Sequence, residues 1–326
     1  RYKVELDISL FAKLKNVFIQ IPMIRELCQF QFFRDDPMKV FFKYSCLGFI
    51  FFNSIVSSHA LDADAGGIGP VPAGTNFFAY YYQHAERDKM YIGNKEAEGD
   101  QKLVSDVMLF RFGHYYEFLN VPMTTQLIIP YSKIEAKEDI SSLGSDQGLG
   151  DIFLSQGVFI YRNDAIKGSA MFTQYLAIPT GDYDRNKSIN IGENRYKYIA
   201  QLSYTRRILP KIAGEIIGDT TFYGSNNDLA SGGKLKQDNG FQIQTNARYF
   251  LKDNWDLRAA LSYADLGNVE KNGVKTDGTK QSKFWVGTSY SPTKTTNFIV
   301  YTGRDIAVEN GFKENLRVNF RFVKLF

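Results

Sequence analysis

Few side chains in this sequence have the types and spacing that catalysis or metal binding requires. The run 84–88 (HAERD) brings the imidazole of His84 close to the carboxylates of Glu86 and Asp88, a set that could serve acid–base chemistry or hold a metal ion. A solvated charged rim at the end of a strand is the alternative, and we favour it. His114 lies 30 residues further on, near the opposite end of the next expected strand, so a shared metal site is not expected.

The segment Asp182–Glu193 (DYDRNKSINIGE) has the twelve-residue length of a calcium-binding loop. Its candidate ligands, at the spacing of that loop, are Asp182, Asp184, Asn186 and Glu193. Lys187 stands where such a loop requires glycine, and strands rather than helices are expected on both sides. A polar outer loop held by its own side-chain turns is the alternative. An ion bound here would be structural, and we predict no cofactor.

The end of the chain indicates which kind of element would position such polar groups. In Asn315–Phe326 (NLRVNFRFVKLF) apolar and polar residues alternate, and successive strand residues point to opposite faces. One face carries Leu316, Val318, Phe320 and Phe322, and the other carries Arg317, Asn319, Arg321 and Val323. An apolar outer face, a polar inner face and an aromatic residue at the membrane interface are typical of a transmembrane barrel strand.

This ending also resembles the carboxy-terminal signature by which bacterial outer-membrane barrels are recognised for assembly. Phe320, Phe322 and Phe326 are its candidate signal residues, whereas Lys324 stands where the signature is usually apolar. The resemblance implies that the barrel assembly machinery and outer-membrane lipid are partners of this chain.

Segments of the same kind recur and predict an all-β fold, a transmembrane antiparallel up-and-down β-barrel of about 12 strands. The expected strands are 75–85, 103–117, 122–136, 149–161, 168–180, 194–206, 211–223, 240–250, 254–265, 282–291, 295–306 and 314–326. The links alternate between tight turns and long polar segments, as short periplasmic turns and longer extracellular loops would. A periplasmic β-sandwich is the alternative, but it would not explain so many long strands with charged residues inside the alternation.

The first part of the chain has the features of an export signal. A short basic region begins at Met38, an apolar run covers Cys46–Val56, and small residues at Ser58 and Ala60 mark a cleavage site. The apolar run is shorter than the ~20 residues that a membrane span needs, which disfavours a retained anchor. We therefore expect residues 1–37 to be an upstream segment outside the mature protein, 38–60 a signal peptide, 61–74 a flexible periplasmic or lumenal segment, and 75–326 the barrel.

Charge and cysteine content exclude several other classes of function. The chain has 39 Lys+Arg and 35 Asp+Glu, of which residues 1–60 hold 8 and 5, so the excess of basic charge lies mostly in the leader. A nucleic-acid partner is therefore not expected. Cys28 and Cys46 also precede residue 61, so we expect no disulfide, thiolate nucleophile or cysteine-ligated metal in the mature chain.

Three stretches resemble a known family. Residues 71–91 (VPAGTNFFAYYYQHAERDKMY), 148–152 (GLGDI) and 179–196 (PTGDYDRNKSINIGENRY) resemble its opening, its glycine-rich start of a strand and its middle motif. The family is the one named for the meta-pathway of phenol degradation, and the likeness covers essentially all of the mature chain in order. It implies an outer-membrane barrel often called a transporter for aromatic compounds. The resemblance indicates the fold more directly than the substrate, because function depends on the residues of a specific site and not on the fold alone.

We therefore expect a bacterial outer-membrane channel or transporter-like barrel for passive passage of small-molecule solutes, aromatic or anionic ones among them. A barrel of about twelve strands lies between small filled barrels and wide porins, so its lumen should be narrow. The candidate path residues are the basic Arg195, Lys197, Arg248, Arg258, Lys283, Arg317 and Arg321 and the acidic Glu215 and Asp219. Arg and Lys in a pore favour anions. The alternative is that these charges pair with one another and only hydrate a closed interior.

The competing class is an outer-membrane structural barrel, or a lipid-face hydrolase, with a plugged interior. A hydrolase would need a serine, a histidine and an orienting polar group within hydrogen-bond reach on its lipid-facing surface. No stretch resembles the motif around the serine of outer-membrane phospholipases, so we predict that the protein is not an enzyme. Whether the segment 61–74 enters the lumen as a plug depends on the tertiary structure.

Overall fold

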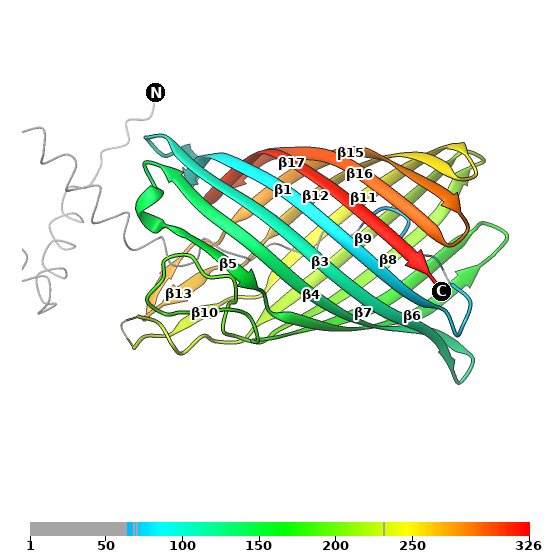
Figure 1. The fold of residues 1–326 in the computed structure, drawn as a ribbon, viewed down its shortest axis with the longest axis horizontal. Coiled ribbons are helices and arrows are strands. Elements are labelled where there is room, and N and C mark those ends of the chain that lie inside the picture. Colours follow the sequence, from blue (N-terminus) through cyan, green and yellow to red (C-terminus); the bar gives the residue numbers. More distant parts are fainter. Residues whose placement is uncertain (1–63, 68, 70, 231) are drawn as a thin grey trace, which may run out of the picture. The chain divides into compact units, whose positions relative to one another are not determined.

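The computed structural model describes residues 64–67, 69, 71–230 and 232–326. In this part of the chain, twelve long strands form a closed antiparallel barrel (Figure 1). They are β1 (Asn76–Ile92), β3 (Gln101–Phe118), β4 (Val121–Glu138), β6 (Ile152–Asn163), β7 (Gly168–Ile178), β8 (Lys197–Leu209), β9 (Ile212–Tyr223), β11 (Gly240–Lys252), β12 (Trp255–Asp265), β15 (Lys280–Thr293), β16 (Thr296–Glu309) and β17 (Gly311–Leu325). β17 pairs with β1 and closes the barrel. The predicted fold class and strand number are confirmed.

The expectations for residues 1–37, 38–60 and 61–63 concern parts of the chain outside the described residues. No helix within the described ranges is long and apolar enough to cross a membrane.

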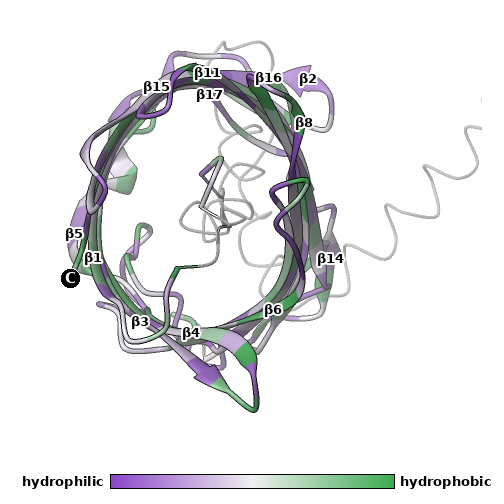
Figure 2. Ribbon diagram, turned by 90° about the vertical axis from the view of Figure 1, so that its right-hand side faces the viewer, coloured by the Kyte–Doolittle hydropathy of each residue, from purple (hydrophilic) through white to green (hydrophobic). Residues whose placement is uncertain are grey.

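Each strand has one polar and one apolar face because its side chains alternate in direction. In β11, Gln242, Gln244 and Asn246 are buried, whereas the intervening Phe241 and Ile243 are exposed. The view along the barrel shows the strands as a ring around the lumen (Figure 2). The buried polar side chains belong to the face of each strand that points into this lumen. The exposed apolar faces form the surface that contacts lipid.

The two ends of the barrel differ, as the alternation of link lengths predicts. At the end that carries Phe326, neighbouring strands are joined by tight turns. Between β3 and β4, Leu119 and Asn120 have φ angles of 51° and 63°, the left-handed conformations of a two-residue hairpin turn. The long links at the other end carry a 3-10 helix (Ser141–Leu143) and the short strands β2 (Lys95–Glu96), β5 (Ser145–Leu149), β10 (Leu235–Gln237), β13 (Val269–Lys271) and β14 (Val274–Thr276).

One strand boundary differs clearly from the expectation. β1 continues to Ile92, seven residues beyond the expected end at residue 85, so the run 84–88 lies inside a strand. The ladder continues there because Arg87 is paired with Glu314 of β17 and Leu103 of β3. Charged residues replace the apolar ones in this part of β1, so the sequence shows no apolar–polar alternation there. The backbone still pairs with both neighbouring strands, because backbone hydrogen bonds do not require alternation.

Candidate functional site

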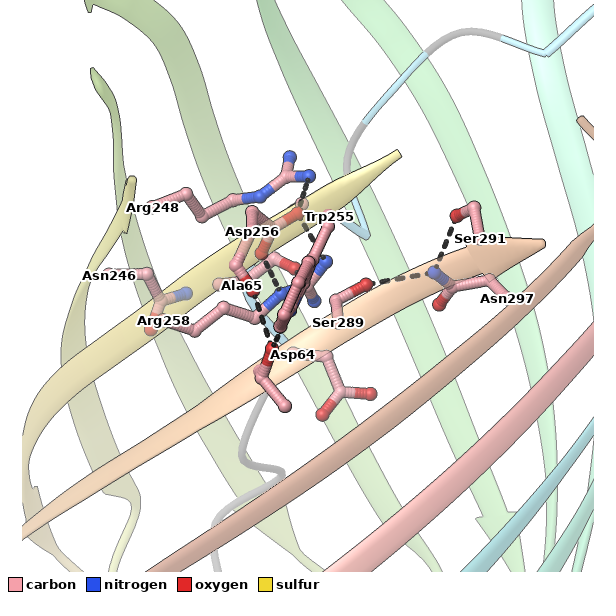
Figure 3. A network of polar contacts seen from close by, with 12 residues as sticks. Asp64, Ala65, Asn246, Arg248, Trp255, Asp256, Arg258, Ser289, Ser291 and Asn297 are labelled. Carbon is pink, nitrogen blue, oxygen red and sulfur yellow. Dashed lines mark hydrogen bonds and ion pairs between the residues drawn. The ribbon is translucent and has the colours of Figure 1, made fainter. Parts of the chain in front are cut away.

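An ion cluster on β11 and β12 lines one side of the lumen (Figure 3). The carboxylate of Asp256 accepts hydrogen bonds from Arg258 Nε at 2.6 Å and from Arg248 Nη2 at 2.7 Å. Strand alternation points all three side chains inward, because the neighbouring Tyr249 and Leu257 are exposed on the outer face. Two guanidinium groups therefore share one carboxylate on this wall.

The beginning of the described chain lies against this cluster. Asp64 forms an ion pair with Arg321 of β17, with Asp64 Oδ2 and Arg321 Nη1 2.7 Å apart. The next residue, Ala65, is 4% exposed, and its carbonyl oxygen accepts a hydrogen bond from Arg258 Nη1 at 2.5 Å. Figure 3 shows Asp64 and Ala65 beside the Asp256–Arg258 pair. These contacts connect the segment to two separate strands of the inner wall.

Gly66 extends the same set of contacts to a third strand. Its N–H donates to Glu215 Oε2 of β9 at 3.1 Å, and the same oxygen accepts from Asn246 Nδ2 at 2.9 Å. Gly66 has a φ of 77°, and a Cβ at this position would meet Arg248 Nη1 at 2.3 Å. Glycine is therefore required both by the backbone conformation and by the close approach of the arginine.

A second ion cluster lies nearer the end with the long loops. Glu314 of β17 is 1% exposed and accepts hydrogen bonds from Arg87 Nη2 at 3.0 Å and Arg317 Nη2 at 2.8 Å. Its own N–H donates to Asp305 Oδ2 at 2.7 Å. Lys283 of β15 is buried and interacts electrostatically with both carboxylates. We call the inward side chains of these two clusters, on β1, β11, β12 and β15–β17, the charged wall.

A third group of charges lies at the start of β8. Glu193, in the loop before this strand, forms ion pairs with Arg195 at 2.7 Å and Lys197 at 2.5 Å, and all three side chains are buried. Burial acts to raise the pKa of the Glu193 carboxyl, but Lys197 and Arg195 bring this pKa below its ordinary value. The spacing along the sequence makes Glu193 a candidate calcium ligand, whereas the structure gives this carboxylate two cationic partners.

All nine predicted path residues lie on the inward faces. Those that are buried are Arg195, Lys197, Glu215, Asp219, Arg258, Lys283 and Arg317, and those that are partly exposed are Arg248 and Arg321. The structure divides most of them among the three charge groups, whereas Asp219 lies between Gln201 and Gln242 on neighbouring strands. Their ion pairs correspond to the alternative in which lumenal charges pair with one another.

The remaining arc of the inner wall carries two apolar clusters set among polar side chains, such as Gln126, Thr173 and Gln201. One cluster contains Ile128, Tyr175 and Ile199, with Leu109 and Phe153 packed against it. A second contains Phe159, Met171 and Ile217, with Tyr115 packed against it. We call these two clusters, whose buried residues lie on β4 and β6–β9, the apolar wall. In the order of strands around the barrel, this arc is continuous and adjoins the charged wall between β9 and β11.

Several residues that line the lumen were not among the predicted path residues. Arg111 lies on the inward face of β3, in the same phase as Leu109, and strict period-two counting along residues 103–117 would have found it. Trp285 of β15 is buried two residues from Lys283 and would have been found in the same way. Asp64 has no such signal, because no strand pattern precedes residue 75.

The loop 179–196 is joined to the wall at a break between β5 and β6. β4 pairs with β5 as far as Leu149 and with β6 from Phe153 onward. At the break, the buried carboxylate of Asp151 accepts the N–H groups of Gly181 at 2.9 Å and Glu193 at 3.0 Å. A Cβ on Gly181 would lie 2.8 Å from the Cα of Gly192, so the two backbones are in direct contact. Two stretches that carried the family resemblance, 148–152 and 179–196, therefore bind each other.

The candidate calcium ligands have other partners in this loop. Asp182 Oδ2 accepts the N–H of Leu149 at 2.8 Å, and Asp184 Oδ1 accepts the N–H of Asn186 at 2.9 Å. Lys187 Nζ donates to Asp146 Oδ1 at 2.7 Å, and this hydrogen bond raises the pKa of Lys187. The calcium site stays a prediction, and these contacts favour a polar loop held by its own side-chain turns.

His84 and His114 contact acids and an amide. His84 Nδ1 lies 2.9 Å from Asp106 Oδ1 and His84 Nε2 lies 3.5 Å from Glu86, on the outer face near the long loops. His114 Nδ1 lies 2.9 Å from Asn76 Oδ1 at the opposite end of the barrel. Neither ring contacts a serine hydroxyl within the described ranges, where no group of three His, Cys, Asp or Glu is arranged to hold a metal ion.

The candidate assembly residues face outward on the closing strand. The ring centroid of Phe298 on β16 lies 6.3 Å from that of Phe320 and 5.3 Å from that of Phe322. Phe326 is 68% exposed, and its backbone exchanges two hydrogen bonds with Asn76 at the start of β1. The last residue of the chain therefore completes the ladder that closes the barrel.

Comparison with known proteins identifies the family. Residues 85–322 match the family described as "Putative MetA-pathway of phenol degradation". The crystal structure of the COG4313 outer membrane channel from Pseudomonas putida F1 is 31% identical, covers 81% of this chain and 100% of its own chain, and has a TM-score of 0.78. The beta domain of the Bordetella autotransporter BrkA is 10% identical, covers 78% of this chain and 100% of its own, and has a TM-score of 0.48, too distant to support an argument. No curated protein matches. The chain therefore belongs to this family and forms a channel of the bacterial outer membrane.

Proposed function

We propose that the barrel is a passive channel in which two chemically different walls select small solutes. The observation that carries this proposal is that the two apolar clusters lie on one arc of the lumen and the ion clusters with Asp256 and Glu314 lie on the other. Apolar side chains suit the body of an aromatic solute, and the arginines of the other wall suit a negative group. Small aromatic or anionic solutes are the proposed cargo, and transport without catalysis is the proposed activity.

The ion pairs determine how strong the charge preference is. Glu314, Glu193 and Asp256 each neutralise part of the charge of two cations, so the positive field is weaker than the basic residues alone would produce. We therefore expect a modest preference for anions rather than exclusion of cations.

In this proposal the segment Asp64–Gly66 narrows the path. Its ion pair and hydrogen bonds reach β9, β12 and β17, and Ala65 is almost fully buried among inward side chains. Solutes must pass beside these residues or displace them, so the segment limits the conductance of the channel.

Planar-bilayer recordings test the channel directly. Protein purified from outer membranes should give a small conductance in KCl, and deletion of residues 61–74 should increase it. Conductance that is equal in the two proteins would contradict the narrowing role, and an intact barrel that does not conduct in either form would contradict the channel itself.

Reversal potentials across a KCl gradient test the charge preference. The wild-type protein should favour chloride, and Arg317→Glu combined with Arg321→Glu should shift selectivity toward potassium, because both side chains line the path. A cation-selective wild-type channel, or selectivity that the double variant leaves unchanged, would contradict the proposed role of these arginines.

The same proposal assigns insertion to the barrel assembly machinery, with Phe320, Phe322 and Phe326 as the signal. The outward placement of Phe320 and Phe322 and the exposure of the terminal Phe326 support it, since a recognised signal must be accessible before the barrel closes.

A further inference from the structure

We infer that Arg111 binds the carboxylate of solutes whose apolar body rests on the neighbouring cluster of Ile128, Tyr175 and Ile199. This inference rests on the proposed channel function and names, within the lumen, a recognition site that the predicted path residues do not include. Four features of the structure support it: the partners of Arg111, its place on the wall, the direction of its free donors and the contrast with other lumenal arginines.

Arg111 is surrounded by neutral groups. Its Nε donates to Gln126 Oε1, its Nη1 donates to the hydroxyl of Tyr81 at 3.3 Å, and its guanidinium carbon lies 6.0 Å from the ring centroid of Phe77. It also interacts electrostatically with Tyr175. Among the residues that the structure describes, no carboxylate lies within ion-pair distance of Arg111, so its charge has no counter-ion there.

Other lumenal arginines have a carboxylate partner. Arg87 and Arg317 bind Glu314, and Arg321 binds Asp64 on the far side of Tyr81. These lumenal arginines are therefore each paired with a carboxylate, whereas Arg111 is not paired with one among the described residues. A cation among neutral groups in a confined lumen attracts an anion more strongly than one whose charge is already balanced.

The guanidinium has donors left for such an anion. Gln126, Tyr81 and Tyr175 are the hydrogen-bond partners of Arg111, so three partners leave part of its five N–H groups for a ligand, and the side chain is only partly buried. A guanidinium presents its N–H groups in a planar fork that matches the two oxygens of a carboxylate. The remaining N–H groups, together with the long and weak bond from Nη1 to Tyr81, form the edge that an entering carboxylate can use.

The apolar part of the site lies on the next strand. Ile128 of β4 is the direct cross-strand partner of Arg111, and alternation places both on the inward face. Ile128 packs with Tyr175 and Ile199, and Leu109, two residues before Arg111, packs against this cluster. A solute whose carboxylate contacts Arg111 therefore has apolar surface within reach for a ring or a short alkyl chain. Solutes with only one of the two parts should bind more weakly.

The test measures block of KCl current in planar bilayers by benzoate, with benzyl alcohol as a neutral probe of similar size and acetate as a carboxylate without an apolar body. The full-length protein is purified from outer membranes, and heat-modifiable gel migration checks that each variant is folded. Benzoate should block the wild-type channel at lower concentration than either control probe.

Arg111→Gln should raise the benzoate concentration for half-block by about tenfold or more, as expected when a charge-assisted hydrogen bond is lost. Arg111→Lys keeps the charge but not the fork and should give an intermediate value. Arg304→Gln is the matched control, because it also removes one guanidinium but from an exposed position on the outer face of β16, where the guanidinium carbon lies 5.9 Å from the ring centroid of Phe284. It should change benzoate block by less than about twofold.

The outcomes separate this site from the channel function. A conducting wild-type protein that benzoate blocks no better than benzyl alcohol overturns the site and leaves the channel standing. Equal benzoate block in the wild type and Arg111→Gln also overturns it. If Arg111→Gln does not fold, the comparison of wild type with Arg111→Lys decides in the same way. An intact wild-type barrel without conductance would instead remove the proposed function.

Discussion

The two walls of the lumen are built from the same kind of strand and differ only in which side chains occupy the inward positions. On β11 and β12 these positions hold amides, arginines and Asp256, connected by hydrogen bonds along the wall. On β6 and β7 they hold Phe159, Met171 and Tyr175, which pack in the apolar clusters, together with small hydroxyl side chains such as Thr173. Exposed large apolar residues lie on the outward faces of strands under both walls, such as Leu154 and Leu176 on β6 and β7 and Ile243 and Leu257 on β11 and β12, so the difference between the walls does not follow from the membrane.

This contrast shows how the barrel separates folding from selectivity. The outer face must be apolar everywhere because charge there costs insertion energy, whereas the inner face can vary from strand to strand. Buried charges on the inner face are stabilised only by ion pairs or by water, and Asp256 and Glu314 supply the ion pairs. Apolar side chains need no such partners, so their surface stays available to a solute. A change on one wall should therefore affect a different property from a change on the other.

The largest effect should come from breaking the outer face, on which both walls depend. Phe320→Asp combined with Phe322→Asp should abolish insertion, because a charged side chain on the lipid face costs free energy of insertion and the double variant adds two of them. Asn319→Asp, at the position just before Phe320 but pointing inward, is the control and should insert normally. Levels of heat-modifiable barrel in isolated outer membranes measure both. Normal levels of the double variant would contradict the role of β17 as the closing, lipid-facing strand.

The next effect concerns the charged wall. Asp256→Asn removes the carboxylate that Arg248 and Arg258 share and should lower the free energy of unfolding by about 1.5–3 kcal/mol, the contribution of a hydrogen bond to a charged group. It should also increase the preference for chloride. Ile199→Asn on the apolar wall should destabilise the barrel without changing the reversal potential. If both variants shift ion selectivity equally, the distinction between the walls does not hold.

A smaller effect should follow from a change at the outer end of the apolar wall. Gly181→Ala places a Cβ 2.7 Å from the carbonyl carbon of Gly150, and forced overpacking costs about 1–3 kcal/mol. We expect a lower thermal midpoint and noisier current, because the loop 179–196 is loosened where Asp151 holds it. Gly218→Ala, whose Cβ would meet only the carbonyl oxygen of Gln242 at 3.9 Å, is the control. Equal thermal midpoints of the two variants would show that this junction does not hold the loop.

The smallest effect should come from Asp64→Asn. This change removes the charge that pairs with Arg321 but leaves the hydrogen bonds of Ala65 and Gly66 in place. Conductance should rise slightly, well below the increase expected from deleting 61–74, and chloride preference should rise because Arg321 loses its counter-ion. Single-channel recordings that give Asp64→Asn the full conductance of the deletion would show that one ion pair holds the whole segment.

Alternation along the chain was enough to predict the barrel, the number of strands and the face on which each path residue lies. The physical reason is that a membrane strand must be apolar on its outer side, and period two then assigns every other residue to the lumen. The prediction worked best where charges stay on one face, as for Arg248 in β11 and Arg258 in β12. It failed at residues 86–92, where charged residues beyond the expected membrane region continue β1 by backbone pairing alone.

The tertiary structure decided which charges meet. Arg321 and Asp64 are 257 positions apart in the chain, and Arg87 and Glu314 are 227 apart, so no local pattern could have paired them. These contacts exist because closure brings β17 beside β1 and because the residues Asp64–Gly66 lie against the inner wall. The isolated charge of Arg111 also emerges only in the closed barrel, since its lack of a counter-ion depends on what every neighbouring strand presents. The sequence by itself determined which face of its strand each polar side chain lies on. Closure of the barrel determined which partner each of these side chains contacts, because the partners come from strands far apart in the chain.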